Sequence, residues 1–268
     1  MPNIAAQSIA SYTSGIVSSF NKSFNLRVPV YFERGEYTVK TASSRRELLQ
    51  VYKLRYEVFH REYKNAKFPF GFDRDKHDQY SDHLIILDNK LGKVVGTYRL
   101  ICSSVSQEYY SESEFNIDDF TKHSGVKVEL SRACIHKDYR TGSVLTLLWR
   151  GLSTYVKACG AQYLFGLASL KSTDEQVAVD FRDYFVRSGL DSKQFEITVQ
   201  PEFKVRNETL KSVEKNLAND VPSLLKSYFK AGAKVYGEPA IDLDFKCIDF
   251  FTIIDLTRMS DQFDKKYQ

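Results

Sequence analysis

Two adjoining runs decide the expected architecture: VKVELSRACI at residues 126–135 and YRTGSVLTLLWRGL at residues 139–152. The first run is rich in apolar and β-branched residues, so it predicts a strand. In the second run Gly142 and Ser143 lead into a helix that ends near Gly160. The predicted buried face of that helix comprises Leu145, Leu148, Leu152, Tyr155 and Val156.

Working outward from these runs, the chain continues to alternate between β and α patterns. We expect strands over residues 37–41, 83–88, 94–102, 162–170 and 247–256, with a hairpin turn at NKLG, residues 89–92. We expect helices from a capping box at residues 44–47 to about Phe59, from a second box at residues 172–175 to about Ser188, and from a Ser223 cap to Gly232. This order fits a single α+β sheet.

The composition narrows the class of protein. A chain of 268 residues with 43% hydrophobic content can bury the core of one domain of about 230 residues, or of two small ones. Its four cysteines have no C-x-x-C pair and no Cys/His ligand spacing, so we expect neither disulfides nor a metal site. A net charge of +4 without a basic run does not suggest nucleic acid.

Residues 1–30 differ from the rest in being rich in Ser and Ala, and we treat them as an N-terminal extension to a domain over residues 31–268. Apolar residues in the extension recur at helical spacing, so a short amphipathic helix could form. It would be packed on the domain, frayed, or laid on a membrane surface, although its polar face lacks the Lys and Arg typical of membrane anchors. No secretory signal and no apolar run of the ~20 residues that span a bilayer is found, so we expect a cytoplasmic protein.

Charged residues in unexpected places are the first functional signal. The motif D-x-x-D-x-x-x-D-H-L directly before a strand contains Asp75, Asp78, Asp82 and His83. Such a pattern suits a cationic substrate, a metal ion or ordinary caps, although its spacing matches neither an EF-hand loop nor a His/carboxylate triad. Arg55 interrupts the apolar stripe of a predicted helix and therefore requires a partner.

Glu129 and Arg132 lie within the strand predicted over residues 126–135, where an unpaired buried charge would cost several kcal/mol. Three is an odd step along a strand, so either one of the two side chains faces outward or a bulge brings both to one site. A structural ion pair and a catalytic role are both open at this point.

The turn at Arg140, Thr141, Gly142 and Ser143 links the strand to the helix. Free backbone N–H groups and the helix dipole can bind one phosphate there, with Arg140 adding charge, although such turns are usually simple caps.

Seven sequence blocks together resemble the autoinducer-synthase-like branch of the GNAT superfamily, and within it the ornithine N-acyltransferases, also called hemolysin-like. The blocks are LRYEVF (54–59), DxxDxxxDHL (75–84), VVGTYRL (94–100), ELSRACIH (129–136), YRTGSVLTLLWRGL (139–152), YLFGLASL (163–170) and GEPAIDLDF (237–245). The resemblance spans residues 37–256 and implies a three-layer α/β/α fold. Its central mixed β-sheet would be splayed, so that a phosphopantetheine thioester can lie between two strands.

The resemblance also implies roles for individual residues. The positions that match the polar network around the acyl-acceptor site are Arg55, Phe59, Asp75, Asp78, Arg99, Glu129 and Arg132, and we add Asp82 and Ser131 as substrate-binding residues. Glu129 is our candidate general base, with His83 as the competing candidate, while Arg99 and Arg132 would hold the acceptor carboxylate or orient Glu129. A nucleophilic role for Cys134 is a minor alternative.

The donor implied by the resemblance is acyl carrier protein, with no bound cofactor and no metal. Residues 140–143 are shorter than the Q/R-x-x-G-x-G/A loop with which GNAT enzymes bind coenzyme A, which suits a donor with one phosphate. Arg150 and Lys157 lie seven residues apart on one helix face, and we expect them to extend the carrier-protein site.

The expected reaction transfers a (3-hydroxy)fatty acyl group to the amine of L-ornithine to give lyso-ornithine lipid. Glycine or tyrosine as acceptor, acyl-homoserine-lactone synthesis, and a non-catalytic carrier-protein or lipid binding module are the alternatives. The lipid product also suggests peripheral contact with the cytoplasmic membrane face.

Overall fold

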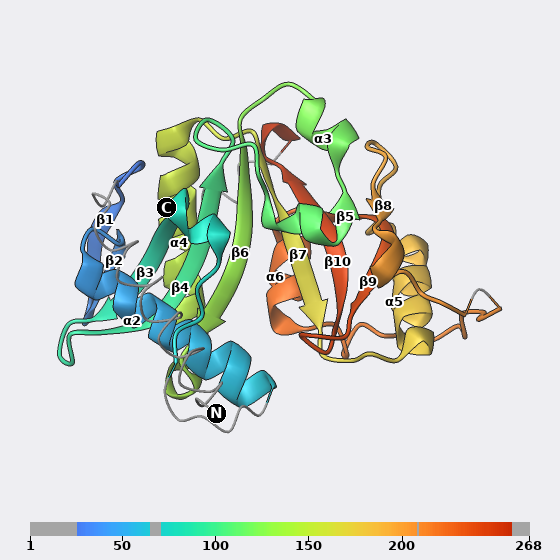
Figure 1. Ribbon diagram of the computed structural model, residues 1–268, viewed down its shortest axis with the longest axis horizontal. Helices are drawn as coiled ribbons and strands as arrows, with labels where there is room; N and C mark the ends of the chain where they lie inside the picture. The colour runs from blue at the N-terminus through green and yellow to red at the C-terminus, as the bar shows by residue number, and fades with distance from the viewer. Residues whose placement is uncertain (1–25, 65–70, 208, 259–268) are drawn as a thin grey trace, which may run out of the picture.

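The computed structural model describes residues 26–64, 71–207 and 209–258, and the predicted N-terminal helix lies outside this part of the chain. Its centre is one sheet in the order β1-β2-β3-β4-β6-β7-β10-β9 (Figure 1). The strands are β1 (Tyr31–Arg34), β2 (Tyr37–Thr41), β3 (Asp82–Asp88), β4 (Lys93–Cys102), β6 (Lys127–Ile135), β7 (Tyr163–Leu170), β9 (Lys234–Asp242) and β10 (Cys247–Asp255). All neighbours pair antiparallel except β6 and β7, so the sheet is mixed, as expected.

Helices cover both faces of the sheet and complete the three layers. On one face, α2 (Arg45–Arg55) continues as a π-helical segment, η1 (Tyr56–Tyr63), and packs Val51 and Leu54 against Ile85. The opposite face carries α4 (Ser143–Cys159), α5 (Glu175–Arg187) and α6 (Ser223–Lys230), which share one apolar core with β3 and β10. Alternating side chains of β3 serve the two layers, because successive residues of a strand point to opposite faces.

Shorter elements complete the first face beside β7 and β10. They are η3 (Tyr110–Ser113), β5 (Phe115–Asn116), α3 (Asp118–Lys122), β8 (Thr198–Val199) and η5 (Pro201–Phe203), while η2 (Lys76–Gln79), η4 (Lys137–Tyr139) and η6 (Leu256–Arg258) lie elsewhere. Phe120 joins this layer to the sheet by edge-on contact with Phe165, with 5.1 Å between ring centroids. These aromatic contacts hold η3 above the middle of the sheet.

The sheet is splayed between its two parallel strands. β6 and β7 pair only over Lys127–Tyr163, Val128–Leu164 and Glu129–Phe165, and they separate toward their C-terminal ends (Figure 1). At the point of separation a Cβ on Gly166 would lie 2.2 Å from the carbonyl oxygen of Leu130, so only glycine fits this close approach. The expected splayed sheet is therefore present.

Several boundaries differ from the sequence expectations. The strands β1 and β9 were not predicted, and the Gly237-Glu238-Pro239 step that bulges β9 explains the second omission, since Gly and Pro interrupt a strand pattern. The helix α5 is capped by Asp174, which accepts a bond from the Gln176 N–H, rather than by a box at Ser172. Ser223 is the first residue of α6 and not its cap.

Candidate active site

A network of buried and half-buried charges lies on the α2 face of the sheet, beside the splay. It comprises three arginines and three aspartates from different elements: Arg55 of α2, Asp73 and Asp75 of the following loop, Asp78 of η2, Arg99 of β4 and Arg132 of β6. The helix η2 positions the acids, because the Asp75 side chain accepts the His77 N–H at 2.9 Å and Asp78 accepts the Asp75 N–H at 2.8 Å. The D-x-x-D spacing is thus a capping box that also presents two carboxylates.

Arg55 is the centre of this network and is fully buried. Its Nη1 donates to Asp78 Oδ1 at 2.6 Å and its Nε donates to Asp73 Oδ1 at 2.7 Å. Burial alone would raise the pKa of Asp78, but the charges of Arg55, His83 and Arg99 and the hydrogen bond from Arg55 together hold that pKa below its usual value. The partner that the sequence required for Arg55 is therefore this pair of carboxylates.

Arg99 and Arg132 converge on Asp75. Arg99 Nη1 donates to Asp75 Oδ1 at 2.6 Å, and Arg132 Nη2 lies 3.3 Å from Asp75 Oδ2. Arg99 also donates from Nε to Ser131 Oγ at 2.9 Å, which brings another expected residue into the site. Its remaining group, Nη2, is buried and has no acceptor within the part of the chain that the structure describes. A buried guanidinium N–H without an acceptor is a natural place for a ligand oxygen.

Arg132 reaches the network because β6 is bulged. Arg99 pairs with Ser131 and Thr97 pairs with Cys134, so one extra residue stands in β6, and Arg132 has a left-handed φ of 51°. The Arg132 guanidinium carbon lies 4.5 Å from the centre of the Tyr110 ring. The Phe245 and Phe59 rings flank it as well, at 5.0 and 5.8 Å. Of the two alternatives for residues 129–132, the bulge is the one present.

Glu129 is fully buried and holds the start of η3. Its carboxylate accepts the backbone N–H of Tyr110 at 2.8 Å, the N–H of Ser111 at 2.7 Å and the Ser111 hydroxyl at 2.6 Å. Burial raises the pKa of Glu129, although these three donors oppose the shift. Both oxygens are thus already engaged within the protein.

The other sequence candidates occupy different surroundings. His83 is buried beside the network, and burial lowers its pKa to about 3, so it is neutral. Asp82 lies on the opposite, α4 face, where it accepts the Tyr155 hydroxyl at 3.0 Å and the backbone N–H groups of Arg27 and Val28, so it does not join the other candidates. Burial raises the pKa of Cys134 to about 12, which keeps it a protonated thiol.

The turn expected to bind phosphate is exposed at the N-terminus of α4. Gly142 is the N-cap with φ 89°, and Thr141 Oγ1 and Ser143 Oγ lie 3.0 Å apart. Arg140 is held by Glu62, at 2.8 Å, and donates to the Ile135 carbonyl. On the same helix Lys157 is exposed and Arg150 is half-buried.

Sequence reasoning missed several residues that line the site. Asp73 stands two positions before Asp75, a spacing that differs from the D-x-x-D step and therefore falls outside the motif. Tyr110, Ser111 and Phe245 carry no local signal, because only the tertiary fold brings them to Glu129 and Arg132.

A separate cavity of about 570 Å³ lies near the β9 edge of the sheet, between α5 and the 204–210 segment. Val179, Arg182 and Pro239 are among its lining residues, and none of the candidates above belongs to that lining.

Comparison with known proteins agrees with this geometry. Residues 54–150, which carry much of the network, match the family model of the acetyltransferase (GNAT) domain. An L-ornithine N(alpha)-acyltransferase of Rhodobacter capsulatus is 27% identical over 246 residues, covering 84% of this chain and 92% of the relative. Another of that name, from Rhizobium meliloti, is 29% identical over 245 residues, covering 84% and 81%.

The solved structures to which this chain is similar include a CoA-dependent acyl-homoserine lactone synthase, BjaI, with SAM and isopentyl-CoA. It has a TM-score of 0.49 and 16% identity, covering 83% of this chain and 81% of that one. Within the described ranges, none of the helices is both long and apolar enough to cross a membrane. The match of residues 54–150 to the GNAT domain model and the curated relatives lead to one conclusion: the chain resembles GNAT enzymes in this segment and is an acyltransferase.

Proposed function

We propose that the chain transfers a 3-hydroxyacyl group from acyl carrier protein to the α-amine of L-ornithine. The observation that carries this proposal is the arginine network beside the splay, in which the buried Arg99 Nη2 has no acceptor among the described residues. A carboxylate is the ligand that such a group favours, since guanidinium and carboxylate form charge-assisted hydrogen bonds. The printed names of the relatives supply ornithine as the acceptor.

Within this proposal Arg99 and Arg132 bind the acceptor carboxylate, and Asp75 keeps the two guanidinium groups in place. The three arginines and three aspartates of the network carry no net charge together. A bound acceptor carboxylate would therefore add one negative charge to the network. Phe59 and Ser131 fix the orientation of the arginines, and Asp78 anchors Arg55. Asp82 supports the opposite face.

In the reaction the neutral amine attacks the thioester carbonyl carbon. A C–N bond forms, the C–S bond breaks, and the pantetheine sulfur leaves as a thiolate that takes up a proton. The amine loses one proton, so the products are the amide and the free thiol of the carrier. Backbone N–H groups near the β6 bulge are candidates for stabilising the oxyanion.

We assign Glu129 a positioning role, because its carboxylate already accepts three hydrogen bonds from η3. The general-base role predicted from the sequence is untested, and His83 is the remaining candidate for it. Contact of the chain with the cytoplasmic membrane face likewise stays a prediction.

The donor proposal rests on the exposed turn at residues 140–143 and on the basic face of α4. One phosphate at the Gly142 N–H and its neighbours would place a pantetheine arm beside the open end of the splay. Acyl carrier protein supplies that single phosphate without an adenine nucleotide.

The test is an assay of the purified chain with 3-hydroxyacyl carrier protein and L-ornithine, in which thiol release is measured and the amide is identified by mass spectrometry. We expect Arg99→Lys to raise the KM for ornithine about 10-fold or more, since lysine cannot reproduce the guanidinium fork. Arg182→Lys, at an exposed pair on α5, is the matched control and should behave as wild type. Absence of any amide product, or an Arg99→Lys KM equal to that of wild type, would contradict the proposal.

A further inference from the structure

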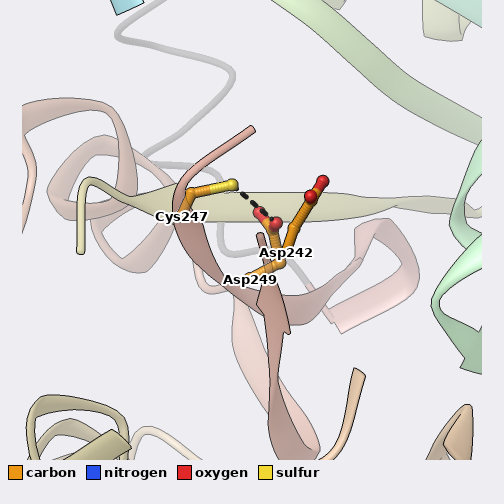
Figure 2. A group of neighbouring side chains, drawn as sticks. All are labelled: Asp242, Cys247 and Asp249. Atoms are coloured by element: carbon orange, nitrogen blue, oxygen red, sulfur yellow. Dashed lines mark hydrogen bonds between the residues drawn. The ribbon is translucent and has the colours of Figure 1, made fainter. Parts of the chain in front are cut away.

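A second group of acids is buried across the splay from the arginine network. We define it as the acidic cluster of Glu114, Asp242 and Asp249, all of which are at most 5% exposed. Asp242 ends β9, Asp249 belongs to β10, and Glu114 directly follows η3. Figure 2 shows the carboxylates of Asp242 and Asp249 beside the Cys247 thiol.

The internal hydrogen bonds of the cluster satisfy it only in part. Asp249 accepts the Ser169 hydroxyl at 2.5 Å and the Cys247 thiol at 3.0 Å, while Asp242 Oδ1 accepts two backbone N–H groups at 2.7 and 2.8 Å. Glu114 Oε2 is buried without a hydrogen-bond partner in the described part of the chain. A proton on Glu114 lets the Glu114 and Asp249 side chains hydrogen-bond each other, and a cationic donor that replaced this proton would also satisfy the unpartnered Glu114 Oε2.

Among the described residues no arginine or lysine forms an ion pair with the cluster as Arg55 does with Asp73 and Asp78. Burial, followed by the charges of Asp249 and Asp242, raises the pKa of Glu114 to about 10, and Arg132 opposes that shift only weakly. Burial also raises the pKa of Asp249. A positively charged ligand would remove this repulsion, whereas an anion would increase it.

The cluster adjoins the acceptor site through two aromatic residues. The Phe245 ring lies 5.0 Å from the Arg132 guanidinium carbon, and the backbone N–H of Phe245 donates to Asp242 Oδ1 at 2.8 Å. The Tyr110 ring lies 4.5 Å from the same carbon, and the charges of Glu114 and Asp249 both act on the Tyr110 hydroxyl. One ligand could therefore contact the arginine network and the acidic cluster at once.

We propose that Glu114, Asp242 and Asp249 bind the side-chain ammonium of the acceptor, so that the enzyme selects diamino acids over neutral ones. This inference rests on the proposed function, because it places the acceptor carboxylate at Arg99 and Arg132. An ammonium group needs two or three oxygen acceptors, and Glu114 Oε2 with its neighbours supplies them. Burial holds the pKa of Cys247 well above its usual value, so its thiol is a donor to Asp249 and not the thiolate that a metal ion prefers.

The experiment compares L-ornithine with L-norvaline, which has the same carbon chain without the side-chain amine. Binding of each is measured by calorimetry on the full chain without donor, and acyl transfer is measured separately with 3-hydroxyacyl carrier protein. We expect wild type to prefer ornithine by about 100-fold or more in kcat/KM, since a site with buried polar groups rejects a ligand that leaves them unpaired. Ornithine binding should also release protons, because the ammonium displaces the proton held by Glu114.

Two near-isosteric variants, Glu114→Gln and Asp249→Asn, should each raise the KM for ornithine about 30-fold or more and so reduce the preference for ornithine over norvaline. Asp255→Asn, at the far end of β10, is the control and should match wild type. No variant changes the other titratable groups that face the cluster, which are Arg132, Tyr110, Cys247 and Lys64. Thermal unfolding confirms that each variant is folded.

The outcomes separate the two proposals. Equal transfer to ornithine and norvaline by wild type would overturn the ammonium site and leave the acyl-transfer function standing. Selective ornithine binding that is lost in Glu114→Gln, without any transfer, would support the site and overturn the function. Stabilisation by Mg²⁺, Ca²⁺ or Zn²⁺ that disappears in Asp249→Asn, with no response to ornithine, would identify a metal site and overturn the inference.

Discussion

At the scale of single residues, the positioning role proposed for Glu129 rests on the hydrogen bonds that its carboxylate accepts. Its two oxygens face three donors on Tyr110 and Ser111. In Glu129→Gln one of these donors would meet the amide NH₂, so even an isosteric change disturbs η3. We expect this variant to lower kcat/KM about 10-fold or more and Ser111→Ala to lower it by less, both without changing the shape of the pH profile.

The same pair of variants tests the base role. Burial raises the pKa of Glu129, and a base works only in its deprotonated form, so a base role predicts activity that falls as pH drops through a value above the usual ~4.3. If that inflection disappears in Glu129→Gln and persists in Ser111→Ala, Glu129 is the base and the positioning role is wrong.

A charged residue within an apolar pattern was the feature of the sequence that indicated site residues. Arg55, Arg99 and Arg132 interrupt apolar patterns, and each one belongs to the network. Glu114 gave no such signal, because an acid in a polar segment reads as exposed and only the packing of η3 on β10 buries it. Asp82 was wrongly predicted to bind substrate because it shares a sequence motif with Asp75 and Asp78. Its side chain lies on the other face of the sheet, where it accepts the Tyr155 hydroxyl.

At the scale of elements, regular hydrophobic periodicity predicted helices and strands correctly, whereas elements with an interrupted pattern were missed. The predicted α4 matches its observed bounds within one residue, and Gly160 is its left-handed C-cap. The edge strand β1 and the bulged β9 escaped prediction, because a short exposed strand and a Gly-Glu-Pro step lack the usual pattern. The π-helical η1 escaped too, since its spacing departs from 3.6 residues per turn.

The basic face of α4 gives the prediction at this scale. Reversing Arg150 and Lys157 together to Glu should raise the KM for acyl carrier protein several-fold with little change in kcat, because surface charges act mainly on association. The effect should weaken as salt shortens the screening length below ~8 to 10 Å. Lys193→Glu, exposed on the loop after α5, serves as the control. Equal use of acyl-coenzyme A and acyl carrier protein without salt dependence would contradict a carrier-protein site.

For the whole molecule, the acidic cluster links stability to pH. The folded chain keeps a proton on Glu114 up to about pH 10, whereas the unfolded chain loses it near ~4.3. Between these values the folded state binds more protons, so this residue's contribution to the free energy of unfolding falls as pH rises. Compared with wild type, Glu114→Gln should therefore raise the unfolding midpoint more at pH 8 than at pH 5.5, as measured by thermal melts. A variant with the same pH slope as wild type would show that Glu114 is ionised in the folded protein.

The splay has a consequence for how the two halves of the molecule behave. Beyond Glu129 and Phe165, β6 and β7 share no register pairs in the described chain, so three rungs alone tie the sheet together along its middle. A pantetheine arm carries amide groups like those of a peptide. If it lies in the gap, the donor takes the place of an absent strand, and loading the enzyme is then akin to a final step of folding.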